Sequence, residues 1–119
     1  MFPKWKFPIV PTLGTRYGLC MRIIARKTLR DFWSKPAFAE SEHALKAWFH
    51  IAKEADWARP VDVKRAFGSA SVVADNRVIF NICGNKYRLI VKINYPYRVC
   101  YIRFIGTHDA YDQIDATSI

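Results

Sequence analysis

The hydrophobic pattern in the first half of the chain follows a helical period. Between 26 and 33 one helix face is apolar, and its members are Leu29, Phe32 and Trp33. After Pro36 a longer apolar stripe predicts a second helix over 38–55, with Ala44, Leu45, Trp48, Ile51, Ala52 and Ala55 as its members. Residues 56–68 contain Pro60 and show no clear period, so we expect a loop there.

Residues 71–106 have the composition and alternation of strands. The runs that predict strands are 72–73, 77–82, 86–94 and 98–105. Typical turn residues separate these runs, namely Asp75-Asn76, Gly84-Asn85 and Tyr95-Pro96-Tyr97. A further strand is expected at 21–25, ahead of the helices, and a short helix at 109–115. This order predicts an α+β fold in which two N-terminal helices cover one face of a small, mainly antiparallel sheet.

The chain length of 119 residues is that of one compact domain, which we assign to residues 21–119. Residues 1–20 differ from the rest, because they contain three of the six prolines, no acidic residue and neither period. We therefore expect an irregular N-terminal extension. Its origin stays open: it is either part of the natural protein or an upstream segment ahead of a domain that begins at Met21.

The N-terminal residues and the cysteines indicate in which cellular compartment the protein is found. Lys4 and Lys6 precede apolar residues as in a signal peptide, but prolines interrupt that stretch. The three cysteines, an odd number without a C-x-x-C pair, are typical of free thiols in a reducing compartment. No run approaches the roughly 18–20 apolar residues of a membrane span. We expect a cytoplasmic protein without a membrane partner.

The charge balance narrows the class of partner. Nineteen Lys and Arg residues against ten Asp and Glu give a net charge of +9, which favours an anionic partner and nucleic acid first. Between residues 77 and 103 there is no acidic residue, and the six basic residues are Arg77, Lys86, Arg88, Lys92, Arg98 and Arg103. The positive charge is therefore concentrated on the predicted strands.

Strand alternation sorts these residues onto one face. The face that the helices cover should hold Val78, Phe80, Ile82, Tyr87, Leu89, Val91, Ile93, Cys100, Ile102 and Phe104. The opposite face gathers Asn81, Lys86, Arg88, Lys92, Tyr101 and Arg103. Cations beside a ring that can stack suit phosphates and unpaired bases. The alternative is an ordinary solvated sheet face, but such faces normally mix both signs of charge. We expect RNA-binding residues at Asn81, Lys92, Tyr101 and Arg77.

A candidate catalytic group follows the last strand. His108 stands at a strand end or helix entry, and Tyr111 comes three residues later, near the same helical face. RNA cleavage needs one group to take the 2′-OH proton, one to protonate the leaving 5′-oxygen, and cations for the phosphorane. His108 and Tyr111 could supply the first two, and Arg88, Arg103 and Lys86 the third. The alternative is that His108 caps a helix and Tyr111 packs against the sheet.

The sequence gives little reason to expect a metal or cofactor. His43 and His50 lie seven residues apart, about 10 Å on a helix, which is too far for one metal ion. His108, Asp109 and Asp112 could bind a metal in principle, but the neighbouring positive charge disfavours one. We therefore expect no metal and no cofactor. Asp112 either orients His108 or caps the last helix, and the cap is the preferred interpretation.

Two motifs in the second half of the chain resemble the HigB family of bacterial toxins. They are Phe80-Asn81-Ile82-x-Gly84-Asn85-Lys86-Tyr87-Arg88-Leu89 and Tyr101-Ile102-Arg103-Phe104-Ile105-Gly106-Thr107-His108-x-x-Tyr111-Asp112. The resemblance extends over about 21–119 and implies a RelE-like toxin fold. It also implies an endoribonuclease that cuts messenger RNA in the A site of the 30S ribosomal subunit and so inhibits translation.

The resemblance implies partners as well as an activity. It predicts a HigA-type antitoxin with a helix-turn-helix, in a heterotetramer of two toxins and two antitoxins that represses its own operon. Operator DNA would then be bound only through the antitoxin. The residues that carry the family site over to this chain are Lys86, Arg88 and Arg103 for phosphate charge and His108 and Tyr111 for proton transfer. A binding module without catalysis, using the same face on RNA or the ribosome, is the alternative.

Overall fold

The computed structural model describes residues 20–119. The expected N-terminal extension, apart from Cys20, lies outside the described residues. The elements in chain order are β2 (Arg22–Ile24), α1 (Arg26–Trp33), the 3-10 helix η1 (Pro36–Ser41), α2 (Glu42–Glu54), α3 (Pro60–Ala66), β3 (Ser71–Val73), β4 (Arg77–Ile82), β5 (Tyr87–Asn94), β6 (Val99–Thr107) and α4 (His108–Tyr111). Among residues 20–119, no helix is long and apolar enough to cross a membrane.

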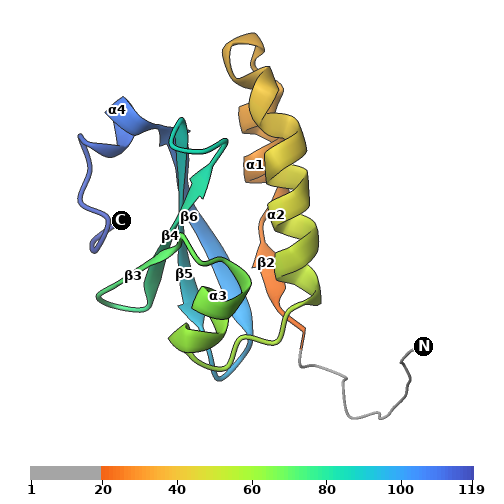
Figure 1. The fold of residues 1–119 in the computed structure, drawn as a ribbon, viewed down its shortest axis with the longest axis vertical. Helices are drawn as coiled ribbons and strands as arrows, with labels where there is room; N and C mark the ends of the chain where they lie inside the picture. Colours follow the sequence, from red (N-terminus) through yellow and green to blue (C-terminus); the bar gives the residue numbers. More distant parts are fainter. Residues whose placement is uncertain (1–19) are drawn as a thin grey trace.

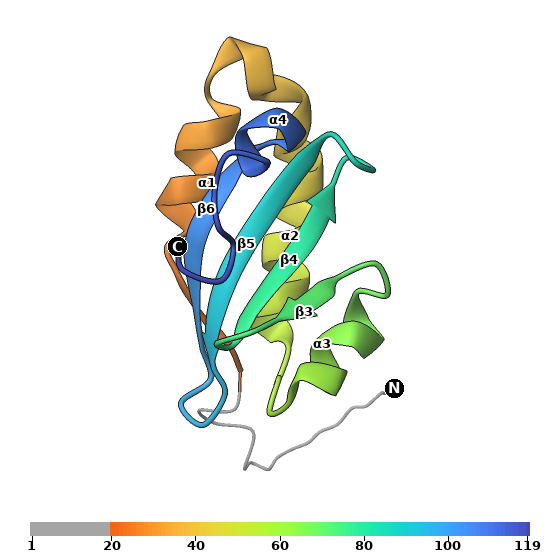
Figure 2. The ribbon, with the colours of Figure 1, turned by 90° about the vertical axis from the view of Figure 1, so that its left-hand side faces the viewer.

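The five strands form one sheet in the order β2-β6-β5-β4-β3 (Figure 2). β2 runs parallel to β6, and every other neighbouring pair is antiparallel. The three predicted turns join β3 to β4, β4 to β5 and β5 to β6. Asp75 and Asn76 both have positive φ, 59° and 63°, which a tight hairpin turn requires and which these residue types tolerate. The α+β class and the mainly antiparallel sheet are thus confirmed.

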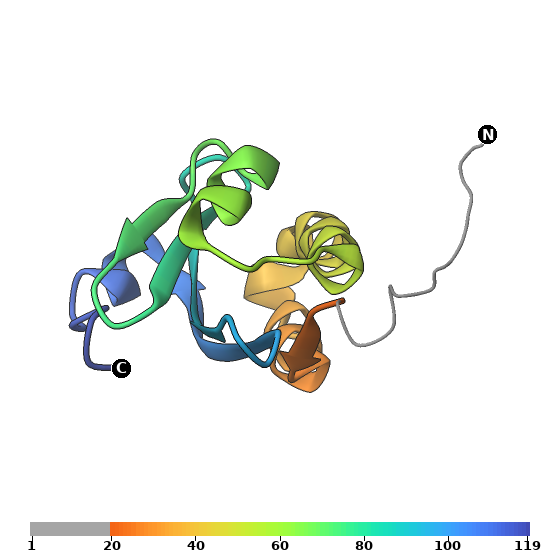
Figure 3. The ribbon, with the colours of Figure 1, turned by 90° about the horizontal axis from the view of Figure 1, so that it is seen from below.

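The helices lie on one face of the sheet, and the C-terminal end of the chain lies on the other. Figure 1 shows α1 and α2 to the right of the sheet, while the segment that follows α4 runs along the left-hand, opposite side. The view from below in Figure 3 shows the sheet between these two layers. The two faces of one sheet therefore have different surroundings.

The helical layer differs from the expected pair of helices. A 3-10 helix, η1, precedes α2. The helix α3 occupies part of 56–68, so the loop predicted for that stretch was wrong. Pro60 lies in the first turn of α3, where its missing N–H costs nothing. The Asp62 carboxylate accepts the backbone N–H groups of Ala58 and Arg59 at 3.0 and 3.1 Å. The proline and this cap begin a helix that apolar periodicity alone does not indicate.

The core lies between the helices and the sheet. Leu29, Leu45, Val63, Leu89 and Cys100 are fully buried there. Aromatic rings fill its centre, since the Phe80 ring centroid lies 5.3 Å from that of Trp48, 5.1 Å from that of Phe67 and 6.3 Å from that of Trp57. Most of the apolar positions predicted for the covered strand face lie in this core.

Strand alternation assigned two positions on β6, Phe104 and Ile105, to the wrong faces. The β5–β6 register pairs Ile90 with Phe104 but Val91 with Ile102, so a β-bulge at Arg103 inserts one extra residue into β6. Beyond the bulge the alternation reverses. Ile105 packs against the core, and Phe104 lies on the face away from the helices. A one-residue insertion moves every later side chain to the other face, and here it brings an aromatic ring to the predicted RNA side.

Candidate functional site

Three residues line up across one end of β4, β5 and β6 on the face away from the helices. Asn81 of β4 pairs with Arg88 of β5, and Arg88 pairs with Gly106 of β6. Lys92, Tyr101 and Arg103 lie farther along the same face. We call the surface formed by Asn81, Arg88, Lys92, Tyr101 and Arg103 the cationic face. The structure thus brings together most of the residues that alternation predicted.

Arg88 and Tyr111 are in contact at one end of the cationic face. The Arg88 guanidinium carbon lies 5.7 Å from the centroid of the Tyr111 ring, within the range of a cation–π contact. The same guanidinium donates a hydrogen bond to the Asn85 carbonyl at 3.1 Å. These two contacts hold a cation next to a phenol, which is the combination that the sequence predicted for phosphate chemistry.

His108 begins the short helix α4 directly beside this pair. The Thr107 hydroxyl caps α4 by accepting the Ala110 N–H at 3.1 Å, and the His108 N–H donates to the Lys86 carbonyl at 3.1 Å. The His108 Nδ1 lies 3.2 Å from a carboxylate oxygen of Asp112, which also ends α4. Asp112 therefore lies beside the imidazole and is also the C-cap residue of α4. The contact is made at Nδ1 and does not involve Nε2.

Lys86 is turned toward the helical layer. Its ammonium lies 2.8 Å from one carboxylate oxygen of Glu40 and 3.0 Å from the other, and the Tyr87 hydroxyl donates to the same group at 2.9 Å. The hydrogen bond from Lys86 lowers the pKa of Glu40, and the Glu40 carboxylate in turn raises the pKa of Lys86. Burial, and then the bond to Glu40, raises the pKa of Tyr87. Lys86 is thus paired with a carboxylate rather than free beside Arg88.

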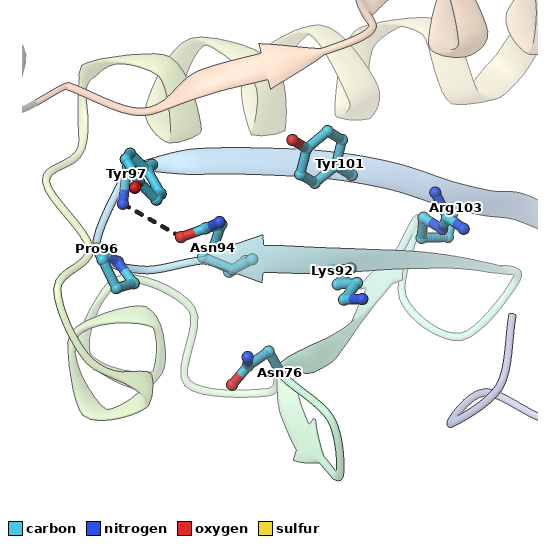
Figure 4. A pocket seen from close by; sticks show the side chains of 8 residues that line it. Asn76, Lys92, Asn94, Pro96, Tyr97, Tyr101 and Arg103 are labelled. Atoms are coloured by element: carbon cyan, nitrogen blue, oxygen red, sulfur yellow. Dashed lines mark hydrogen bonds between the residues drawn. The ribbon is translucent and has the colours of Figure 1, made fainter.

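A second group of residues lies toward the β5–β6 turn. Lys92 and Tyr101 are cross-strand partners, and with Arg103 and Tyr97 they line a hollow of about 590 Å³ (Figure 4). Tyr101 pairs with Lys92 and Gly106 pairs with Arg88, so four residue steps of β5, or about 13 Å at the rise of a strand, separate the two pairs. The cationic face is therefore long enough to contact more than one nucleotide.

Two of the basic residues counted in the sequence have their side chains engaged elsewhere. Arg77 is only 7% exposed, and two of its guanidinium nitrogens donate to the Ile119 carbonyl at 2.7 and 3.2 Å. The C-terminal segment lies over this part of the sheet (Figure 2), so Arg77 could contact RNA only if that segment moved. Arg98 forms an ion pair with Asp56. Neither residue is available at the surface in this conformation.

Phe104 and Tyr97 are site candidates that sequence reasoning missed. Phe104 lies against Gly106, because a Cβ added to that glycine would come within 2.6 Å of the Phe104 ring. No feature of the sequence marks the bulge that moves Phe104. Tyr97 was taken as a turn residue, although an aromatic side chain in a turn is itself a signal, and it is 78% exposed.

The structure also brings the possible metal ligands together. His108, Asp109 and Asp112 can place one ligand atom each within 4.8 Å of one another, and all three are exposed. Exposed carboxylates commonly lie this close without an ion. Because His108 Nδ1 already has Asp112 as its partner, this cluster gives no independent sign of a metal.

Comparison with known proteins identifies the class. The profile of the HigB toxin family, described as the RelE-like toxic component of a toxin–antitoxin system, matches residues 41–114. The chain therefore belongs to the HigB toxin family. It is 28% identical over 94 residues to the mRNA interferase toxin HigB of Escherichia coli K12, covering 77% of this chain and 88% of that protein. The same figures hold for the mRNA interferase HigB of Escherichia coli O157:H7 and of Shigella flexneri.

Proposed function

We propose that this toxin is an endoribonuclease that cleaves messenger RNA on the ribosome and thereby inhibits translation. The observation that carries the proposal is the cluster of Arg88, Tyr111 and His108 at one end of the cationic face. It combines a cation, a phenol and an imidazole with a free nitrogen. The relatives named mRNA interferases support the same activity.

The proposed chemistry needs only the side chains of this cluster. The 2′-oxygen of a nucleotide attacks the adjacent phosphorus, the bond from phosphorus to the 5′-oxygen breaks, and the products are a 2′,3′-cyclic phosphate and a 5′-hydroxyl end. His108 and Tyr111 carry the two protons, one from the 2′-oxygen and one to the leaving oxygen. Arg88 stabilises the charge on the phosphorane, and Asp112 orients the imidazole through Nδ1. In this mechanism no metal ion takes part.

The exposure of the cluster favours a substrate that is ordered elsewhere. The side chains of His108 and Asp112 are 50% and 53% exposed, so the cluster is open to solvent. In-line attack requires the 2′-oxygen, the phosphorus and the leaving oxygen to be held in a near-attack geometry. An open surface supplies little of that order, whereas mRNA in the A site of the 30S subunit is already positioned. We therefore propose that cleavage depends on the ribosome.

Roles at the remaining predicted residues follow from their positions. Arg103, exposed at the bulge, contacts phosphate, and Asn81, Lys92 and Tyr101 contact the RNA chain along the cationic face. Lys86 contributes charge at the edge of the site and would reach phosphate only by leaving Glu40. Arg77 becomes a contact only if the C-terminal segment moves.

The proposed partners follow from the family. A toxin that acts on the ribosomes of its own cell must be inhibited there, and we propose a HigA-type antitoxin with a helix-turn-helix. The complex would hold two toxins and two antitoxins and bind operator DNA through the antitoxin. The proposed location is the cytoplasm, where ribosomes and the operon are found.

The test is a map of mRNA 5′ ends by primer extension in a purified translation system, with and without ribosomes. Wild type should produce cuts at fixed positions within codons only when ribosomes are present. His108→Ala should reduce the cleavage rate by about 10²–10⁴-fold. The matched control is His50→Ala, which removes an exposed histidine on α2 and should cleave like wild type.

Two results would contradict the proposal. Cuts that survive His108→Ala at the wild-type rate would leave an enzyme with a different site. No cuts with any variant, combined with salt-sensitive binding to ribosomes, would establish the alternative of a non-catalytic RNA- or ribosome-binding module.

A further inference from the structure

A hollow lies on the cationic face beside the turn between β5 and β6, away from His108. Its volume is about 590 Å³, within the roughly 300–1,000 Å³ of pockets that hold small ligands. The polar and aromatic residues around it are Asn76, Lys92, Asn94, Tyr97, Tyr101 and Arg103. Figure 4 shows that they come from three places: β5 and its turn, β6, and the β3–β4 turn.

Tyr97 is the unusual residue of this hollow. Its side chain is 78% exposed, the highest exposure among the large hydrophobic residues that face solvent in the described part of the chain. An exposed ring gains little burial in the folded protein alone, so its flat face is available for stacking on a base. Tyr101 lines the same hollow, and Figure 4 shows both rings along its β6 side, Tyr97 at the turn and Tyr101 farther along the strand.

The turn that carries Tyr97 is held on both sides. The Tyr97 N–H donates to the Asn94 side-chain oxygen at 3.2 Å, and the next residue, Arg98, forms an ion pair with Asp56. Arg98 has a positive φ of 57° and its backbone N–H donates to the Tyr95 carbonyl at 3.2 Å. A ring on an anchored turn loses little further freedom when a ligand stacks on it, which favours binding.

The chemistry of the lining matches one unpaired nucleotide. Two aromatic rings can stack on a base, the Lys92 ammonium and the Arg103 guanidinium can contact phosphate, and the side-chain amides of Asn76 and Asn94 can hydrogen-bond a base edge. An acidic peptide would use the two cations but would leave the rings and amides without a role.

We infer that the hollow between Tyr97 and Tyr101 is a subsite that binds one unpaired base of the RNA, several nucleotides from the bond that is cut. This inference rests on the proposed function, since it assigns the substrate RNA to the same face. About 13 Å of strand, the four residue steps from Lys92 to Arg88 on β5, separates Tyr101 from the row of Arg88 and Gly106, so the subsite acts on RNA affinity and register rather than on the bond-breaking step.

The first experiment measures binding of a fluorescein-labelled single-stranded RNA of nine nucleotides by fluorescence anisotropy at low salt. Tyr97→Leu keeps an apolar side chain but loses the flat ring, and it should weaken binding about five- to a hundredfold. Tyr97→Phe keeps the ring and should bind like wild type. The matched control is Ile51→Ala, which removes a side chain that is 44% exposed on α2 and should not change the affinity.

The second experiment replaces single bases of the RNA by abasic sites. If one base stacks on Tyr97, an abasic site at one position should cost the same factor as Tyr97→Leu, and the two changes together should cost no more than either alone. Equal affinities of Tyr97→Leu and wild type, or fully additive losses at every abasic position, would overturn the subsite.

These outcomes are distinct from failure of the proposed function. A wild-type protein that cleaves mRNA on ribosomes, with RNA affinity unchanged by Tyr97→Leu, would refute the subsite and leave the enzyme in place. Conversely, RNA binding that depends on the Tyr97 ring, in a protein that never cleaves, would refute the enzyme and support the subsite.

Discussion

The two faces of the β4–β5–β6 sheet are built from the same strands but differ in burial and in charge. Val78, Phe80, Leu89, Val91 and Ile93 alternate onto the side of α1 and α2, and each is at most 2% exposed. On the other side, Asn81, Arg88, Lys92, Tyr101 and Arg103 are all intermediate or exposed. At these positions one residue along a strand separates a buried side chain that holds the fold from a side chain open to solvent, whereas Ile79 and Ile90 on the second side are also buried.

Stability explains the residues of the apolar face but not those of the cationic face. Burial explains the apolar face completely, because removing those side chains from water stabilises the protein. Nothing comparable explains the cationic face, where like charges gather without acidic residues on the same strands between 77 and 103. Like charges on one surface repel in the folded protein, so their arrangement is better explained by an anionic ligand than by stability.

The largest effect is expected on the apolar face. Phe80→Ala would empty the space between the Trp48 and Phe67 rings, whose centroids lie 5.3 and 5.1 Å from that of Phe80. The free energy of unfolding should fall by about 3–5 kcal/mol. Chemical denaturation measures it. The control on the opposite face, Lys92→Ala, should stay within about 0.5 kcal/mol of wild type. Equal losses for the two variants would show that the faces do not differ in this way.

The next largest effect is expected at Arg88 on the cationic face, where a substitution should reduce activity without reducing stability. Arg88→Ala removes the guanidinium next to Tyr111, and the cleavage rate should fall by about 10²–10³-fold because the phosphorane loses a charged donor. Its melting temperature should match that of wild type. Arg88→Lys should recover only part of the rate, since an ammonium lacks the planar fork of a guanidinium. An Arg88→Ala protein that unfolds early would instead give this residue a structural role.

A smaller effect on stability is expected at Gly106, which lies against the Phe104 ring next to the bulge. In Gly106→Ala the new Cβ would approach the tip of the Phe104 ring at 2.6 Å, so the ring must shift. The cost should be about 1 kcal/mol, the low end for overpacking, because the tip can move. Gly68→Ala is the matched control, as no atom lies within 4 Å of its added Cβ. Equal thermal stabilities of the two variants would argue against the assigned position of Phe104.

The smallest effect concerns the ion pair that links the helical layer to the β4–β5 turn. Glu40→Gln should lower the melting temperature slightly, because exposed pairs contribute little. Lys86 lowers the pKa of Glu40 in the folded protein, so the contribution is present above the ordinary carboxyl value of 4.5 and is lost as the pH falls through the lower folded value. The difference between the two proteins should therefore vanish in acid and in high salt. A difference that persists at pH 2 would contradict the assignment.

Alternation along the strands was enough to predict most of the sheet and most of the residues that share its cationic face. The strands are marked by alternating apolar residues, and the three turns by typical turn residues. These local patterns were enough to predict that Asn81, Arg88 and Lys92 lie on the face away from the core. The helix α3 could not, because its cap at Asp62 and its initial proline lie outside any apolar period. The roles of Phe104 and Glu40 depend on a bulge and on a contact across 46 residues of sequence, between Glu40 and Lys86, and neither leaves a local signal.

We propose that the cationic face, and not the helical layer, contacts the mRNA. A direct test places 4-thiouridine in the A-site codon of a ribosome-bound mRNA, crosslinks it to the His108→Ala toxin and identifies the modified peptide by mass spectrometry. We expect crosslinks to Tyr101, Phe104 or Tyr111. Crosslinks confined to α2 and α3, residues 42–66, would contradict it.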